Sequence, residues 1–503
     1  MTSIFVLGAG VNGLVAANLL ARAGRTVTVV DSTAAIGAEA RHDILVPGYV
    51  APGILDRTER FSPTVAAALD LGAIPRGQGT MVLSVNPSGI GQLVPDGVGA
   101  EVGELAKDDR AAWRRHQEVH QRLAEVLRPL MESVPPSPLG QHSIGIGWIW
   151  KLARGYARLS RGERELLLRV PPAPLGDWLT EQFQSDAFCA SLSWAGLEAC
   201  FAAPASPGTA AVRMFHDVSD YGPVRGGAPK LLDILEGGCR SRGVSIRLGV
   251  KAKVIVSDGA VVAVDIDGER HKAAAVLSTL NPIHTLLDIV DGAQLAPSLE
   301  RALRNVRQRG TTVRFDFALD NRFTLTDGNR PSRIRIAGGL KGIERAFDAA
   351  KYNVLPENPW MEVRIPSADP ELSGFAPTDG DIVSVLVRYI TASSVPNMDA
   401  VSTLRRSVVG HLNRLCPQFE ECILAERYQG HESLAHEYGL TNGNLSHGEP
   451  GLDQLLSLRP IAQCGRFQTP IARLWLGGMG CHPGGGLTGL GGWLGANVVM
   501  QAL

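Results

Sequence analysis

The chain has 503 residues, which is long enough for about three domains of ordinary size. Its 49 lysines and arginines nearly balance its 50 aspartates and glutamates, so no overall charge attracts the protein to nucleic acid. No run reaches the roughly 18 apolar residues of a membrane-spanning helix, and a soluble protein is expected. The seven cysteines include no Cys-x-x-Cys pair, which predicts reduced thiols and a cytoplasmic location.

The first thirty residues have the pattern of a dinucleotide-binding unit. An apolar run at 4–7 predicts a buried parallel strand, and Gly8, Gly10 and Gly13 follow it as Gly-x-Gly-x-x-Gly. The first glycine permits a tight turn, the second lets the backbone approach a pyrophosphate, and the third lets the next helix lie close to the sheet. That helix is predicted over 11–23, where good helix formers precede a glycine.

An acidic residue ends the second predicted strand. The β-branched run at 26–30 is followed by Asp31, 18 residues beyond Gly13. A carboxylate there accepts hydrogen bonds from a ribose diol and disfavours a 2′-phosphate, which argues against NADP. The motif alone does not separate FAD from NAD.

A second glycine-rich segment, near the C-terminus, favours FAD. A strand is predicted at 474–476, a glycine-rich loop follows it, and a helix is predicted from about 487–489. Bare amide N–H groups and the positive end of a helix suit the negative charge of reduced flavin. A dinucleotide that extends from the first strand to this loop fits FAD, whereas NAD needs one local unit. We expect FAD to be bound by Gly8, Gly10, Gly13, Asp31, Gly478, Gly480, Leu487, Thr488 and Gly489.

Three motifs carry a family resemblance that covers nearly the whole chain. They are GMGCHPGGGLTG at 478–489, EYGLTNGNLSHGEPGLDQLLSLRP at 437–460 and the block at 224–256. Together with the N-terminal unit they resemble the phytoene-dehydrogenase-like branch of the flavin amine oxidase superfamily. That branch includes carotenoid desaturases and isomerases, retinol saturase and pyridine nucleotide-disulfide oxidoreductase domain-containing proteins. The resemblance implies that the backbone of Val254 pairs with the adenine.

The chain departs from the family pattern at two places. The family usually has a Gly-Gly pair after the acidic strand end, and this chain has Gly37–Ala38, which is expected to shift the backbone near the flavin. Amine oxidases proper carry an acidic residue in the C-terminal loop, where this chain has Met479. The second departure agrees with the carotenoid-like branch, which also lacks that acid.

The predicted fold class is α/β, with a discontinuous Rossmann-type FAD-binding domain and an inserted α+β substrate domain. Residues 253–279 alternate strand-like runs with Asp-Gly turns and predict a three-strand meander. We assign the FAD-binding domain to 1–70, 220–290 and 455–503, and the substrate domain to 71–219 and 291–454. The first insertion is mostly helical in pattern, and the second contains strand-like runs at 311–319 and 382–389.

Residues 144–161 combine aromatic and basic side chains in a helical pattern. Trp148, Trp150 and Tyr156 alternate there with one lysine and three arginines. Such a helix is able to lie on a membrane surface and admit a lipid-soluble substrate. The alternative is a helix of the substrate domain with its basic face in water.

Two histidines are the candidate catalytic residues. His482 is the first, because its loop is expected beside the flavin and imidazole titrates near neutrality; alternatively it only hydrogen-bonds its own loop. His216, just before the FAD-binding domain resumes, is the second. His447 and Glu449 are expected to order the loop that leads back to the flavin. Neither a Ser/His/Asp order nor a metal cluster stands out in the sequence.

The leading hypothesis is FAD-dependent dehydrogenation of a carbon–carbon bond in an apolar, isoprenoid-like small molecule, with flavin N5 as the hydride acceptor. One alternative is oxidation of a C–N bond in an amine by O₂. The other is a redox-neutral isomerase or a non-catalytic flavoprotein. O₂ and a quinone are both candidate electron acceptors.

Overall fold

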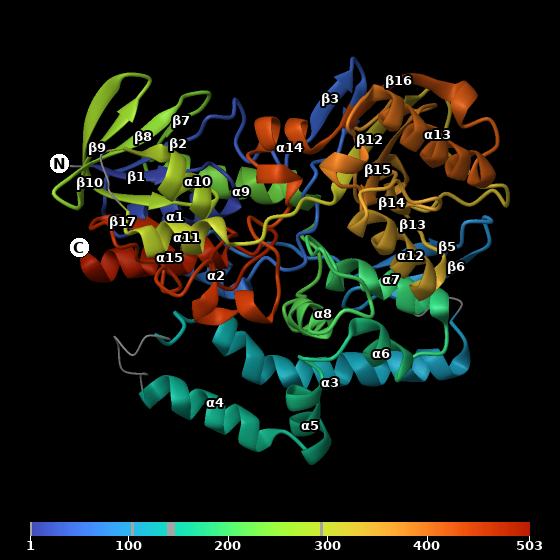
Figure 1. Cartoon of the computed structure of the whole chain (residues 1–503), viewed down its shortest axis with the longest axis horizontal. Helices are drawn as coiled ribbons and strands as arrows, with labels where there is room; N and C mark the ends of the chain where they lie inside the picture. Colours follow the sequence, from blue (N-terminus) through green and yellow to red (C-terminus); the bar gives the residue numbers. More distant parts are fainter. Residues whose placement is uncertain (1–2, 102–104, 138–145, 292–294) are drawn as a thin grey trace.

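Two β-sheets, each built from segments far apart in the sequence, form the framework of the molecule (Figure 1). The computed structural model describes residues 3–101, 105–137, 146–291 and 295–503. Helices cover both sheets, and the longest described helix, α3 (Lys107–Met131), lies along one edge of the molecule.

The first sheet contains both ends of the chain. Its strand order is β11-β8-β9-β10-β1-β2-β7, and β17 joins the free side of β10. In this sheet Ser278 pairs with Leu7 on one side and with Leu476 on the other, all in parallel strands. The carboxyl ends of these strands therefore meet at one edge, where ligands bind in open parallel sheets. The strands are β1 (Ser3–Leu7), β2 (Val27–Val30), β7 (Ser245–Arg247), β8 (Ala252–Ser257), β9 (Ala260–Ile266), β10 (Glu269–Ser278), β11 (Val290–Asp291) and β17 (Leu474–Leu476).

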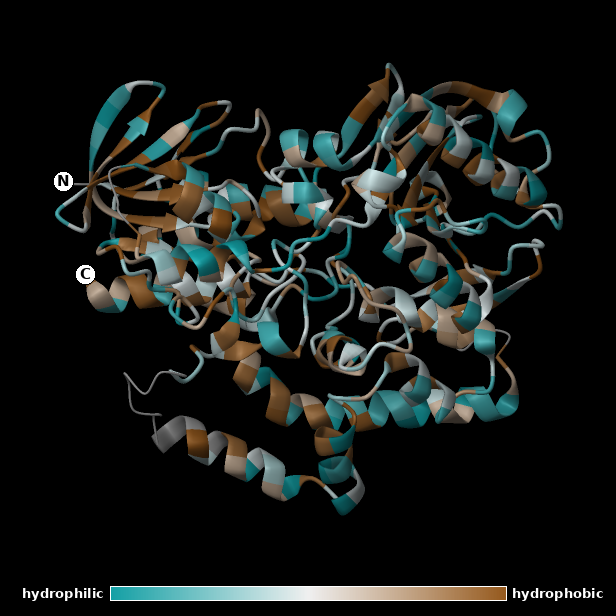
Figure 2. Ribbon diagram, viewed as in Figure 1, coloured by the Kyte–Doolittle hydropathy of each residue, from teal (hydrophilic) through white to brown (hydrophobic). Residues whose placement is uncertain are grey.

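Helix α1 (Val11–Arg22) is almost wholly buried between this sheet and two other helices, α9 (Gly227–Ser241) and α15 (Leu490–Ala502). The central strands β1 and β2 and the helix α1 are strongly hydrophobic (Figure 2), as burial on both faces requires. Smaller elements surround them: α2 (Pro63–Leu69), α10 (Pro282–His284), α11 (Pro297–Arg304), α14 (His431–Tyr438), and the hairpin β3 (Asp43–Val46) and β4 (Tyr49–Ala51).

The second sheet has the order β16-β12-β15-β14-β13-β5-β6. Side chains alternate along its strands, because successive residues point to opposite faces. The apolar side chains of one face, such as Phe315 and Val363, pack on α13 (Met398–Leu415). The side chains of the other face are charged but also buried, as in Arg314, Glu362 and Arg364. The strands are β5 (Thr80–Val85), β6 (Gly91–Asp96), β12 (Thr312–Leu319), β13 (Arg333–Ile336), β14 (Trp360–Arg364), β15 (Asp381–Arg388) and β16 (Ile423–Gln429); α12 (Gly339–Lys351) lies beside them.

A helical layer closes the space beside the two sheets (Figure 1). It consists of α3 (Lys107–Met131), α4 (Ile146–Arg158), α5 (Arg161–Arg169), α6 (Leu175–Thr180), α7 (Asp186–Gly196) and α8 (Thr209–Val218). Among the described residues, none of the helices combines the length and the apolar character needed to cross a membrane.

The expected α/β fold class and the three-strand meander are confirmed. Both turns of the meander are Asp-Gly pairs with positive φ at both residues, which suits the twist of a hairpin. The helical prediction for 71–219 needs one correction, since β5 and β6 lie within it and extend the second sheet from β13. The domain boundaries stay predictions.

Candidate active site

The turn between β1 and α1 is closed so tightly that it excludes side chains. A Cβ on Gly13 would lie 1.9 Å from the carbonyl oxygen of Gly8, and Gly8 itself has a φ of +101°. The helix can therefore begin directly against the strand end, and its first amide groups face the open edge of the sheet. Gly10 lies on the open side of this turn, where it lines a groove.

Two carboxylic acids stand beside this turn. Asp31 accepts hydrogen bonds from the Ala9 amide at 2.6 Å and from the amide and hydroxyl of Thr33 at 2.8 Å each. Glu39 has an oxygen only 2.6 Å from where a Cβ on Gly10 would lie. Burial, opposed by a backbone hydrogen bond and assisted by the charge of Asp31, raises the pKa of Glu39 to about 7.

At the Gly37–Ala38 departure, only the first of the two residues has a backbone conformation that favours glycine. Gly37 has a φ of +58° and donates its amide to Ala9, whereas Ala38 is not in the positive-φ region and needs no glycine. The family's second glycine is therefore not required by the conformation of this chain.

The C-terminal glycine loop packs directly on the N-terminal unit. The amide of Gly492 donates to the side-chain oxygen of Asn12 at 3.1 Å, and a Cβ on Gly492 would lie 2.0 Å from the Asn12 carbonyl oxygen. The helix α15 therefore begins beside the beginning of α1. Gly489 caps α15 with a φ of +71°, and the hydroxyl of Thr488 accepts a hydrogen bond from the Leu490 amide.

A groove extends from Asp31 past Gly10 to Gly486 and Leu487. A Cβ on Gly486 would meet no atom within 4 Å, so the backbone there is open to a ligand. The groove therefore connects the two glycine-rich segments. FAD would contact both segments, whereas NAD needs only one local unit. The other predicted ligands contribute differently: Gly478 and Gly480 pack against Thr279 and Pro282, and Val254 is buried in β8 between β9 and β11, outside the groove lining.

A second cavity shares Gly486 and Leu487 with the groove. Its walls are largely aliphatic and come from several distant segments. They include Ile54, Leu55, Met131, Ala195, Ala199, Val212, Phe215, Leu445, Leu455 and Leu456. A ligand in this cavity would therefore lie against the flavin end of the groove.

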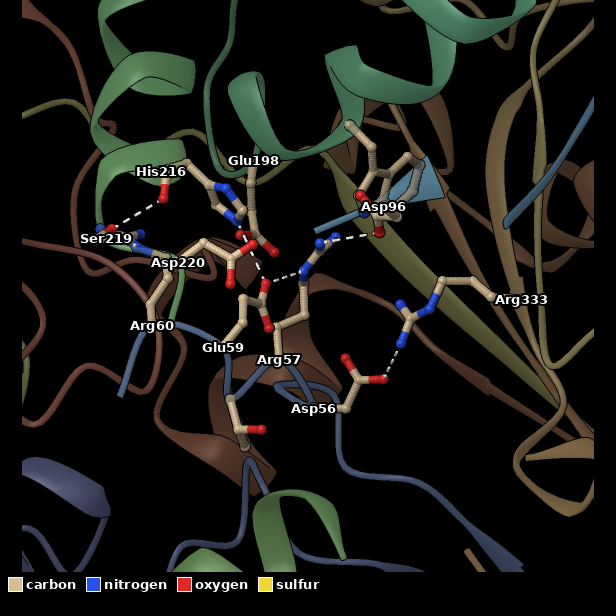
Figure 3. Close-up of polar contacts among 12 residues, drawn as sticks. Asp56, Arg57, Glu59, Arg60, Asp96, Glu198, His216, Ser219, Asp220 and Arg333 are labelled. Carbon is tan, nitrogen blue, oxygen red and sulfur yellow. Dashed lines mark hydrogen bonds and ion pairs between the residues drawn. The ribbon is translucent and has the colours of Figure 1, made fainter. Parts of the chain in front are cut away.

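Charged side chains close one side of the second cavity, where the buried charged face of the second sheet meets residues 56–59. Arg57 donates to Glu59 at 2.7 Å and contacts Asp96 at 3.2 Å (Figure 3). The network continues to Glu362 and Asp56, so that four arginines and four carboxylates are joined by ion pairs of 2.6 to 3.2 Å. The cations are Arg57, Arg333, Arg335 and Arg364, and the anions are Asp56, Glu59, Asp96 and Glu362.

Arg60 lies beside this network without joining it. Its Nε donates to the Ser219 hydroxyl at 2.9 Å, and no carboxylate of the described residues lies within 4 Å of its guanidinium. Its Nη1 would be 3.5 Å from a Cβ on Gly485. Burial lowers the pKa of Arg60 from its ordinary value, against the attraction of Glu198 and Glu59. A cation without an ion-pair contact among the described residues therefore lines the cavity next to the glycine loop.

Arg459 holds the other side of the glycine loop. It is 1% exposed, and its Nη2 donates to the carbonyl oxygens of Ser446, Gly448 and Met479. Burial lowers its pKa to about 10. Since its Nε would lie 2.7 Å from a Cβ on Gly484, only glycine fits there.

Both predicted catalytic histidines line the second cavity. His216, on α8, lies 3.3 Å from Glu59 and points toward it (Figure 3). Burial lowers the pKa of His216, but the carboxylates of Asp217 and Glu59, 3.7 and 3.3 Å from its ring nitrogens, outweigh that effect and raise it. The catalytic roles predicted for both residues stay predictions.

His482 is bonded to a different element from the one expected. Its Nε2 lies 3.0 Å from the carbonyl oxygen of Leu130, so it donates to the end of α3 and not to its own loop. Burial, together with the charge of Arg459, lowers its pKa to about 4. This ring therefore holds the glycine loop against α3 as a neutral group.

Glu449 has the ordering role expected of it. It accepts from the Arg309 guanidinium at 2.7 and 2.8 Å and from the Arg309 amide at 3.0 Å. This clamp fixes the segment that begins at Asn444 and carries His447 into the groove lining. His447 is buried, and burial lowers its pKa to about 4.

The sequence profile of the NAD(P)-binding Rossmann-like domain matches residues 6–53. Over 99% of its length the chain is 26% identical to pyridine nucleotide-disulfide oxidoreductase domain-containing protein 2 of mouse and of rat, and the match covers 93% of each relative.

Solved structures share the whole fold at low identity. An oxidoreductase from Methanosarcina mazei superposes with a TM-score of 0.60 at 16% identity, covering 99% of this chain and 100% of that one. Putrescine oxidase bound to putrescine gives 0.60 at 14%, and cyclohexylamine oxidase from Brevibacterium oxydans gives 0.56 at 12%; each covers 100% of this chain and 98% of the other. The chain has the fold of FAD-dependent oxidoreductases. FAD is the cofactor consistent with this fold and with the groove.

Sequence reasoning missed the charged side of the cavity. The sequence did indicate a charged face, because charged and apolar residues alternate in these strands, for example in RIRI at 333–336 and WMEVR at 360–364. Such alternation normally indicates one buried and one solvated face. Here both faces are buried, because the helical layer and residues 52–60 cover the charged one.

Proposed function

We propose that the protein is an FAD-dependent dehydrogenase of the phytoene-dehydrogenase-like branch that oxidises a carbon–carbon bond in a substrate with an apolar body and an acidic end. The observation that carries this proposal is the second cavity, which meets the cofactor groove at Gly486 and Leu487. FAD bound in the groove supplies the hydride acceptor for such a reaction.

The aliphatic walls account for the apolar body of the substrate. Side chains such as Ile54, Leu55 and Leu456 offer contact without hydrogen bonds, and burying apolar surface against them contributes about 25 cal/mol per Å². A pocket that combines apolar walls with polar groups at defined positions is typical of small-molecule sites. Met131, at the end of α3, adds a flexible side chain at the same wall.

Arg60 accounts for the acidic end. It is a cation without an ion-pair partner among the described residues, and guanidinium binds carboxylate through two parallel hydrogen bonds. Burying that charge without a partner is unfavourable, so an anionic ligand gains affinity by compensating it. The position of Arg60 beside Gly485 brings the acidic end near the flavin end of the groove.

Amine oxidation is the second candidate. Glu198 lines the cavity with its nearest ion-pair contact, to Arg388, at 4.0 Å, so it is available to an ammonium group. The fold is shared with putrescine oxidase and cyclohexylamine oxidase, whose names describe amine substrates. In that reaction O₂ would reoxidise the flavin.

Anaerobic bleaching of the flavin absorbance tests the proposal. Branched, unsaturated carboxylic acids should bleach the flavin, and a desaturated product should be found by mass spectrometry. Matched alcohols should react at much higher concentrations only. Bleaching by amines with peroxide release in air, and none by the acids, would establish the second candidate. A flavin whose oxidation state no substrate class changes would favour a redox-neutral isomerase or a non-catalytic flavoprotein.

The membrane contact proposed for 144–161 concerns α4 and the residues around it. Residues 144 and 145 lie outside the described part of the chain, and so do the side chains of Trp148 and Lys151. Trp150 is 70% exposed and shares this exposed surface with Ile149, Tyr156 and Arg154. We propose that this surface contacts the lipid in which an apolar substrate, and a quinone acceptor, would be dissolved.

A further inference from the structure

Two helices bring together three side chains with metal-ligand chemistry, outside the site described above. His116 and His120 lie one turn apart on α3, and Asp217 lies on α8. Their ligand atoms all lie within 4.8 Å of one another. His116 Nε2 is 3.0 Å from Asp217 Oδ2, and His120 Nε2 is 3.9 Å from the same oxygen.

The tautomer of each ring is fixed by the partner of its Nδ1. His120 Nδ1 lies 2.7 Å from the carbonyl oxygen of His116, which accepts only, so His120 carries its proton on Nδ1. His116 Nδ1 lies 3.0 Å from Oε1 of Gln182, whose amide nitrogen donates to the Trp178 carbonyl. That bond sets the orientation of the amide, so His116 also carries a proton on Nδ1.

Each neutral ring therefore presents a lone pair at Nε2. His120 Nε2 is buried without a hydrogen-bond partner among the described residues. His116 Nε2 faces a carboxylate oxygen, which is also an acceptor, at only 3.0 Å. Two acceptors at this distance repel one another unless a positive charge lies between them: either a second proton on His116 or a metal ion.

We propose that His116, His120 and Asp217 bind a transition-metal dication of the zinc class. Neutral imidazoles held by hydrogen bonds to carbonyl or amide oxygens are the usual metal-binding arrangement of histidine. Ligands about 2 Å from a tetrahedral ion lie about 3.3 Å apart. The separations of 3.0 and 3.9 Å reach that value with small side-chain rotations.

A proton on His116 explains less of the geometry than a metal ion does. It would satisfy the contact with Asp217 but leave the buried lone pair of His120 unpaired. A dication is compatible with both lone pairs.

Arg213 and a neighbouring cavity complete the surroundings. Arg213 contacts both oxygens of Asp217, at 2.9 Å to Oδ2 and 2.7 Å to Oδ1. A carboxylate has about four lone-pair positions, so Asp217 still has one available for a metal ion. A neighbouring cavity is lined by all three ligands, and its charged lining also includes Asp220, Arg128 and Arg213. It leaves room for water as a fourth ligand. Two nitrogen ligands favour Zn²⁺, Cu²⁺ or Ni²⁺ over Mg²⁺ or Ca²⁺.

The test is the metal content of the full-length protein, purified without a histidine tag, incubated with Zn²⁺ and dialysed. Elemental analysis should find about one zinc per chain in the wild type. H120Q and H116Q should each lose most of it while keeping the flavin absorbance. The matched control is H411Q, since His411 also bonds an i−4 carbonyl through Nδ1 and has a buried, unpartnered Nε2, but belongs to no such cluster.

Anomalous diffraction at the zinc edge gives a second readout that does not depend on how the variants fold. A peak between the three ligand atoms supports the proposal. A wild type that retains no zinc overturns it and leaves a protonated His116. Zinc that H120Q and H116Q retain in full also overturns it, because the ion then lies elsewhere.

Discussion

Gly492 and Asn12 are 480 residues apart and yet touch: the Gly492 amide donates to Asn12 at 3.1 Å. Because α1 and α15 begin side by side, the first residues of α1 and the loop residues before α15 line the same groove. The contact explains why the cofactor site needs both ends of the chain. It also makes that site sensitive to a single methyl group.

G492A should destabilise the protein and weaken FAD retention. The added Cβ would lie 2.0 Å from the Asn12 carbonyl oxygen, so the helices must separate, at a cost of about 1–3 kcal/mol. Thermal unfolding and the flavin-to-protein absorbance ratio measure both effects. G237A is the control, because Gly237 lies in α9 with no atom within 4 Å of its added Cβ. Equal behaviour of the two variants would contradict the tight contact.

FAD affinity should fall as the pH rises through about 7. The pKa of Glu39 is raised to about 7, so its carboxyl is neutral below that pH and negative above it. A negative Glu39 beside Gly10 repels the pyrophosphate, and Asp31 adds to the charge. Fluorescence titration of the apoprotein should show roughly tenfold weaker binding at about pH 8 than at about pH 6. E39Q should bind tightly at both; a pH dependence unchanged in E39Q would contradict this.

R60M should raise the KM for an acidic substrate far more than it lowers kcat at saturation. Removing one partner of a buried charge pair costs about 2–5 kcal/mol, which corresponds to roughly 30- to 1000-fold or more in affinity. Rates of flavin bleaching as a function of substrate concentration measure this. The neutral alcohol analogue should bind R60M and wild type alike. A similar loss with the alcohol would show that Arg60 shapes the cavity and does not bind the acid.

His482 should contribute to loss of stability in acid. Its pKa is lowered to about 4 in the folded state, so folding favours the neutral ring. The resulting contribution to the free energy of unfolding is present above about pH 6.5 and is lost as the pH falls toward 4. Between about pH 7 and about pH 5 the loss is about 2 kcal/mol. H482Q keeps a donor for Leu130 and removes the titration, so urea unfolding should depend less on pH. H436Q, at an exposed histidine, should behave as the wild type does.

W150A should reduce binding to anionic lipid vesicles by tenfold or more, since full burial of a large apolar side chain contributes about 1.5–3 kcal/mol. Cosedimentation measures binding, with neutral vesicles as the comparison. Y352A removes another exposed aromatic side chain, just after α12, and should leave binding unchanged. Vesicle binding equal in wild type and W150A would assign α4 to the water-exposed alternative.

The elements that hold the cofactor were predictable because they depend on local chemistry. The glycines at 8, 10 and 13, the strand before them and Asp31 all lie within thirty residues, and each residue type suits its own backbone conformation. The same holds for β17, the loop after it and α15. That the two segments meet on either side of β10 was not predicted, because it depends on the pairing of strands far apart in the sequence.

The cavity chemistry was not predictable in the same way. Arg60 differs from its neighbour Arg57 only in having no carboxylate partner, and this depends on Asp96 and Glu59. His116 and Asp217 are 101 residues apart, and their pairing depends on the packing of α3 against α8. Neither the missing partner of Arg60 nor the pairing of His116 with Asp217 can be predicted from the spacing of these residues in the sequence.

The sequence by itself determined the fold class, the dinucleotide turn and the second glycine segment, since conformational preference and hydrophobic period act over a few residues. The tertiary structure decided which charges are paired. It left Arg60 uncompensated beside the glycine loop, turned His482 toward Leu130, and placed two imidazole lone pairs around Asp217. Electrostatic energies depend on the distances between charges and on their burial, and neither can be derived from the order of the residues.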